Sequence, residues 1–174
     1  MARCMKISAL VCLALTAVFV TAYQIMPIDI ILSLAITAGT AGYHLWMRLL
    51  VGYLFKLLLN NKVDYNKKWF RVGQTEQRLY DLLKVKKWKK FLPTYDPAAF
   101  DKRRHSWDQI VMAMCQSELV HETIVILSFL PILSSLWFGA TLVFVLTSVL
   151  SAAFDLMFVM IQRYNRPRVL RIIK

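Results

Sequence analysis

The chain has 174 residues, of which 58% are hydrophobic and only 18% are charged, and its mean hydropathy is +0.50. This composition is too apolar for an ordinary soluble domain. The formal net charge is +12, so we ask where along the chain the positive charge lies.

Apolar residues are clustered in four stretches, which are residues 7–23, 28–47, 123–137 and 138–161. A helix needs about 20 apolar residues to cross a hydrocarbon core of about 30 Å, so the second and fourth stretches are long enough and the first is marginal. We predict an all-α integral membrane protein with about four transmembrane helices in two pairs, the first pair within residues 1–60.

The first stretch has an alternative interpretation as a signal peptide, because Arg3 and Lys6 precede its apolar core. Its removal would leave an odd number of crossings. The cysteines Cys4, Cys12 and Cys115 fall in membrane or cytoplasmic positions, so no disulfide is predicted.

The segment between the helix pairs, residues 61–105, is basic and rich in aromatic residues. Within it, residues 77–94 place apolar side chains mainly at helical spacing with lysines between them. Such a segment is expected to lie on an anionic phospholipid surface. Nucleic acid is not an expected partner, since the membrane is the nearer counter-charge.

Residues 106–174 form the predicted second helix pair with a basic tail. Ser106 is a suitable N-cap residue, and the helical pattern from there predicts one long helix to about Ser134, with a kink or an end at Pro131.

Lys and Arg residues are confined to three blocks: two before the first apolar stretch, fifteen from Arg48 to Arg104, and five from Arg163 to Lys174. The positive-inside rule therefore places both termini and the central segment in the cytoplasm. Four crossings satisfy this parity, and two re-entrant hairpins would satisfy it too. The predicted location is the cell membrane, with multiple passes and both termini cytoplasmic.

A first polar constellation lies in the third helix, where Glu118, His121 and Glu122 share one face. Ionisable groups entering a membrane are costly, so they indicate a functional site, or else ion pairs with nearby Lys and Arg. The Glu-x-x-His spacing also occurs in helical di-iron proteins, but those need two such motifs and two further glutamates. The chain has one motif, so no metal is predicted.

Two further groups are candidates for binding. Asp155 lies about two turns before the block Gln162-Arg163-Tyr164-Asn165-Arg166-Pro167-Arg168 on the fourth helix. The arginines of this block can bind phosphate or carboxylate groups. His44 and Arg48 lie one turn apart on the second helix as pocket-lining candidates.

Three blocks of this sequence, residues 84–93 (KVKKWKKFLP), 115–121 (CQSELVH) and 162–168 (QRYNRPR), resemble those of the glycosyl-4,4'-diaponeurosporenoate acyltransferase family in order and spacing. The resemblance runs from about Gln74 to the carboxyl end. It implies transfer of a fatty acyl group from acyl-CoA or acyl-carrier protein to a hydroxyl of a lipid or glycolipid acceptor, with no other cofactor.

For this reaction His121 is the natural general base, with Glu118 expected to fix its tautomer. Arg163 and Arg166 are expected to hold donor phosphates or stabilise the oxyanion. The remaining substrate-binding candidates are Gln162, Tyr164, Asn165, Asp155, Glu122, His44 and Arg48. Two alternatives stay open: a non-enzymatic scaffold of a lipid-synthesis complex, and another lipid-modifying transferase such as one that transfers phospholipid headgroups.

Overall fold

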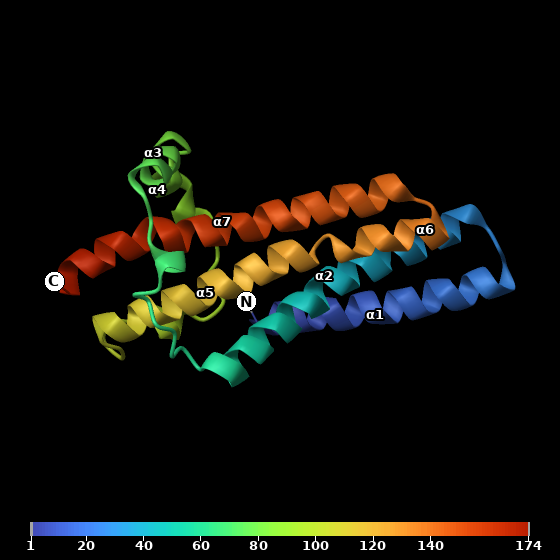
Figure 1. The fold of residues 1–174 in the computed structure, drawn as a ribbon. Coiled ribbons are helices and arrows are strands. Elements are labelled where there is room, and N and C mark those ends of the chain that lie inside the picture. Colours follow the sequence, from blue (N-terminus) through green and yellow to red (C-terminus); the bar gives the residue numbers. More distant parts are fainter. Residues whose placement is uncertain (1, 174) are drawn as a thin grey trace. The chain divides into compact units, whose positions relative to one another are not determined.

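The computed structural model describes residues 2–173, and all the regular secondary structure in that range is helical (Figure 1). Lys174, which was counted in the basic tail, lies outside the described residues. The elements are α1 (Ala2–Ile25), α2 (Asp29–Leu59), η1 (Lys68–Phe70), α3 (Gln74–Leu82), α4 (Val85–Trp88), η2 (Lys89–Phe91), η3 (Pro97–Phe100), α5 (Trp107–Leu127), η4 (Leu130–Ser134), α6 (Ser135–Phe138) and α7 (Thr141–Ile173).

Four helical segments of the described chain are long and apolar enough to cross a membrane: Arg3–Ile25, Asp29–Leu59, Trp107–Phe138 and Thr141–Ile173. Many of their large apolar side chains are exposed, such as Leu13, Leu142 and Leu150. Such exposure would be unfavourable in water and suits hydrocarbon surroundings. The chain is therefore a multi-pass membrane protein, and the predicted all-α class is confirmed.

By its internal contacts the described chain divides into two units. The first contains the residues up to Val51 together with Ile124–Ala153, and the second contains Gly52–Thr123 together with the residues from Phe154 onward. Each unit thus combines residues from both halves of the sequence. The division into 1–60, 61–105 and 106–174 stays a prediction.

In the first unit α1 and α2 lie side by side (Figure 1). The indole Nε1 of Trp46 donates a hydrogen bond to the carbonyl of Ala9 at 3.2 Å. A Cβ added at Gly42 would stand 3.3 Å from the Cβ of Cys12. The absence of a side chain at Gly42 therefore permits the close approach of the two helices.

Helix α5 ends at Leu127, four residues before Pro131. Proline has no N–H to donate to the carbonyl four residues earlier, and its ring would clash with that carbonyl. The hydroxyl of Tyr43 donates to the freed carbonyl of Leu127 at 2.9 Å. The chain continues as η4 and α6, so the expected long helix to Ser134 is wrong in its last turns while the expected end near Pro131 is confirmed.

In the second unit, Ser106 and Gln109 form a reciprocal cap at the start of α5. The Gln109 N–H donates to the Ser106 hydroxyl at 3.3 Å, and the Ser106 N–H donates to Gln109 Oε1 at 3.0 Å. This capping box satisfies two backbone donors that the helix cannot. Ser106 is therefore the cap that the sequence predicts.

Residues 77–94 do not form the continuous amphipathic helix that the sequence pattern suggests. Helix α3 ends at Leu82, and Lys84 adopts a left-handed conformation with φ 53° before α4 begins. Tyr80 and Val85 both pack in a buried cluster with Tyr164. On one helix these two positions would point about 140° apart, so the break at Lys84 allows both to reach the same cluster.

Candidate functional site

The candidate site lies in the second unit, on a polar face of α5 that packs against α7. Glu118 is 0% exposed, and it lies between two arginines of α7. Arg163 Nη1 donates to Glu118 Oε1 at 2.5 Å, and Arg166 Nη1 donates to Glu118 Oε2. A carboxylate buried this completely is stable only when charged partners surround it.

Arg163 and Arg166 also hold the segment that joins α2 to α5. Arg163 makes a two-pronged contact with Glu76, through Nε at 2.5 Å and Nη2 at 3.0 Å. Arg166 Nη2 donates to the carbonyl of Phe70 at 2.5 Å. Two carboxylates and two guanidinium groups therefore form a compact cluster of Glu76, Glu118, Arg163 and Arg166 with balanced charge, which we call the Glu–Arg cluster.

The role of Arg163 and Arg166 in holding donor phosphates or stabilising the oxyanion stays a prediction, and their contacts bear on it. Arg166 is 0% exposed, and the side chain of Arg163 is 16% exposed with its guanidinium held by Glu76 and Glu118. A guanidinium with protein carboxylates at hydrogen-bond distance has little capacity left for a phosphate. Their contacts favour holding α5, α7 and the connecting segment together.

Glu76 and Tyr80 show how strongly this cluster acts on groups outside the membrane-spanning helices. Burial by itself would raise the pKa of Glu76, but hydrogen bonds from Arg163 and Tyr80 and the nearby arginine charge lower it overall. Burial and the hydrogen bond to Glu76 raise the pKa of Tyr80 above its usual range. Glu76 therefore stays ionised as a partner for Arg163.

His121 lies beside Asp155 of α7. Its Nδ1 is 2.8 Å from Asp155 Oδ1, and its ring stacks on Phe158 with centroids 4.6 Å apart and an interplanar angle of 10°. The His121 side chain is 21% exposed and that of Asp155 is 1% exposed. The carboxylate in contact with the imidazole is therefore that of Asp155, while Glu118, the partner that the sequence suggested, contacts Arg163 and Arg166.

The other residues of the 162–168 block make structural contacts. Gln162 Nε2 donates to the Ser117 hydroxyl at 3.3 Å, and Asn165 Oδ1 accepts from Lys89 Nζ at 2.5 Å. Tyr164 is 2% exposed, with the Arg168 guanidinium 3.6 Å from its ring centroid. Tyr164 is therefore packed inside the protein, and its predicted contact with substrate stays a prediction.

The remaining candidates lie in different surroundings. Glu122 accepts a hydrogen bond from Trp69 Nε1 at 3.0 Å in the second unit. Arg48 belongs to the first unit, where its Nη2 donates to the Ser151 hydroxyl at 2.8 Å. His44, also in the first unit, is buried.

No group of three or more His, Cys, Asp or Glu side chains within residues 2–173 is arranged to hold a metal ion. The Glu–Arg cluster and the imidazole–carboxylate pair are two described polar features of the second unit that join α5 to α7. The His121 side chain is 21% exposed and that of Glu76 in the cluster is 25% exposed, so exposure does not separate the two features. The pair differs in holding an imidazole, the side-chain type that most often transfers protons in catalysis.

Glu76, Trp69 and Phe158 are site residues that the sequence reading missed. Glu76 carried a signal, since it is the only glutamate between residues 61 and 105, in a segment dominated by Lys and Arg. Together with four aspartates it is among the few acids of that segment, and an acid among many basic residues is a candidate for an internal ion pair. Trp69 and Phe158 carried no comparable signal.

A family model described as glycosyl-4,4'-diaponeurosporenoate acyltransferase matches residues 65–174. The matched range contains both His121 and Asp155 and all four residues of the Glu–Arg cluster. No match was found among the curated proteins or among the solved structures.

Proposed function

We propose that this chain, which belongs to the glycosyl-4,4'-diaponeurosporenoate acyltransferase family, transfers a fatty acyl group to a hydroxyl of a lipid or glycolipid acceptor, with His121 as general base and Asp155 as its orienting partner. The observation that carries the proposal is the 2.8 Å contact between His121 Nδ1 and the buried Asp155 carboxylate. Acyl-CoA or acyl-carrier protein is the proposed donor, and no other cofactor is invoked.

The geometry of the pair suits proton transfer. With Nδ1–H donated to Asp155, the lone pair of the imidazole is on Nε2, which can accept the proton of the acceptor hydroxyl. The hydroxyl oxygen then attacks the thioester carbonyl, the C–S bond breaks, and the proton passes from Nε2 to the leaving thiolate. Asp155 keeps the correct tautomer and stabilises the imidazolium formed on the way.

The Glu–Arg cluster acts as the frame of this site. His121 is on α5 and Asp155 is on α7, so their contact depends on the register between these two helices. Glu118 lies one turn before His121 on α5, and it forms ion pairs with Arg163 and Arg166 of α7. The two ion pairs fix the register that brings imidazole and carboxylate together.

The exposed part of the connecting segment supports a donor-facing and membrane-facing role. Lys84, Lys86, Lys87 and Lys90 are exposed, and next to them Leu82 is 77% exposed and Phe91 is 78% exposed. Lysines beside exposed apolar residues are typical of segments that meet an anionic lipid surface. We propose that this surface faces the cytoplasm and concentrates an anionic acyl donor there.

The test measures acyl transfer in membranes by lipid mass spectrometry, comparing cells with and without the gene for one acyl-chain mass gained. His121→Ala and Asp155→Asn are each expected to lower the rate by about 100-fold or more, since general-base catalysis contributes about that much. The matched control is His105→Ala, a histidine outside the pair that is expected to keep the wild-type rate.

Folded protein is checked for each variant by its melting temperature in detergent. Near-wild-type transfer by a folded His121→Ala variant would refute the catalytic assignment. If charge reversal at Lys84, Lys86, Lys87 and Lys90 abolished function while His121→Ala did not, the scaffold alternative would hold instead. No new acylated lipid in any cell type would refute acyl transfer itself.

A further inference from the structure

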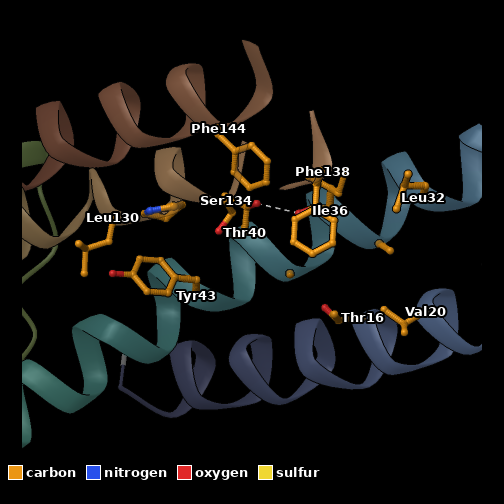
Figure 2. A pocket seen from close by; sticks show the side chains of 13 residues that line it. Thr16, Val20, Leu32, Ile36, Thr40, Tyr43, Leu130, Ser134, Phe138 and Phe144 are labelled. Carbon is orange, nitrogen blue, oxygen red and sulfur yellow. Dashed lines mark hydrogen bonds between the residues drawn. The ribbon is translucent and has the colours of Figure 1, made fainter. Parts of the chain in front are cut away.

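The first unit contains a cavity of about 330 Å³, separate in kind from the polar site described above (Figure 2). The residues that line it come from α1, α2, η4, α6 and α7, and all of these lining residues belong to the first unit. On the α2 wall Ala35 has only a methyl side chain and Gly39 has none, which leaves room between the surrounding helices. The helix η4, which follows the break near Pro131, forms another wall of the same cavity.

The lining of the cavity is apolar in effect, although it includes several hydroxyl groups. Thr16 donates its hydroxyl proton to the Cys12 carbonyl at 2.7 Å, and Thr40 donates to the Ile36 carbonyl at 2.7 Å. Tyr43 donates to the Leu127 carbonyl at 2.9 Å. None of the described lining residues is charged. The fourth hydroxyl in the lining is that of Ser134. A polar ligand group placed here would therefore lose its water and find at most a hydroxyl and no charged partner, which is costly.

The size of the cavity indicates what fits. An apolar cavity of about 150 Å³ in another protein stays dry and takes up benzene, so about 330 Å³ offers room for about a dozen carbon atoms. The cavity lies among membrane-spanning helices, where hydrocarbon is the surrounding solvent.

We propose that this cavity is a binding site for the hydrocarbon chain of a lipid, a linear alkyl chain of about a dozen carbons within the walls. The inference does not depend on the proposed transfer reaction, because it is argued only from the residues that line the cavity in the first unit. The alkyl chain can belong to a bulk phospholipid or to an acyl substrate, and the experiment distinguishes these two sources.

The experiment uses the full-length protein in detergent and a palmitate analogue with a diazirine in mid-chain. After irradiation, labelled peptides are identified by mass spectrometry. Label is expected on the cavity walls in α2 and η4, in excess over exposed apolar positions such as Leu142 and Leu150. Ala35→Phe places a phenyl ring in the cavity and is expected to weaken labelling of the walls about tenfold. Ala41→Phe, on the exposed side of the same helix, is the matched control and should label like wild type.

Competition on the wild-type protein keeps the proposal testable if Ala35→Phe does not fold. Laurate is expected to displace the probe far better than octanoate, with little further gain for palmitate. Displacement by dipalmitoyl phosphatidylglycerol identifies a phospholipid as the source, and displacement by palmitoyl-CoA alone identifies an acyl substrate. Label spread evenly over all exposed apolar helix faces, or no dependence on competitor chain length, overturns the proposal.

Discussion

Replacing Arg166 by Met tests whether the Glu–Arg cluster frames the site. The change leaves two carboxylates, Glu76 and Glu118, with one guanidinium, that of Arg163, and it removes the donor to the Phe70 carbonyl. Arg166 and Glu118 are both 0% exposed, so the unpaired charge cannot be solvated. Removing one partner of a buried pair costs about 3–5 kcal/mol, and we expect a loss of that size in the free energy of unfolding.

The reciprocal change Glu118→Gln leaves two guanidinium groups with one carboxylate and should cost a similar amount. The double variant Arg166→Met with Glu118→Gln leaves the balanced pair Arg163 and Glu76. Its loss should therefore be smaller than the sum of the single losses, with an interaction energy of about 0.5–3 kcal/mol.

The measurement is reversible unfolding of detergent-solubilised protein by a denaturing detergent, with the melting temperature as a second readout. The matched control is Arg171→Met, an exposed arginine of the same helix, which should change stability by less than about 0.5 kcal/mol. If Arg166→Met were as mild as the control, or if the two single losses simply added, the cluster would not be the frame that its geometry indicates.

Two further predictions concern the termination of α5 and the acid dependence of stability. Tyr43→Phe leaves the Leu127 carbonyl without its donor and should lower the free energy of unfolding by about 0.5–1.5 kcal/mol. Tyr53→Phe, at an exposed tyrosine of α2, serves as the control. Equal effects of the two changes would contradict the role of the Tyr43 hydrogen bond. Glu76 has a folded-state pKa below its ordinary value, so its ion pair stabilises the protein above the ordinary glutamate range and this stabilisation is lost as the pH falls through the folded-state pKa. Wild type should therefore be more stable than Glu76→Gln near neutral pH, with the difference vanishing in acid; a difference that grew in acid would show that the sign is wrong.

Hydropathy and local rules were sufficient for much of the fold. Apolar clustering predicted the four spans, because a bilayer requires that length of apolar helix whatever its neighbours are. Ser106 predicted the start of α5, and Pro131 predicted the end of its regular hydrogen bonding, because capping and the missing proline N–H act within one turn. The same reading identified Glu118, His121, Asp155 and the 162–168 block as polar groups that need partners.

Which partners they take was decided only by tertiary structure. His121 and Asp155 are 34 residues apart, and Arg166 and Glu118 are 48 residues apart, so no local pattern links them. Helical spacing favoured Glu118 as the partner of His121. In the structure Glu118 instead pairs with two arginines, because a permanent positive charge stabilises a buried carboxylate more than an imidazole does. The amphipathic pattern of residues 77–94 suggested one helix, but the structure has a break at Lys84. Burying both Tyr80 and Val85 against Tyr164 stabilises the fold more than continuing the helix would. Sequence determines which groups are costly to leave alone in a membrane, and the packing of helices distant along the chain determines how each is satisfied.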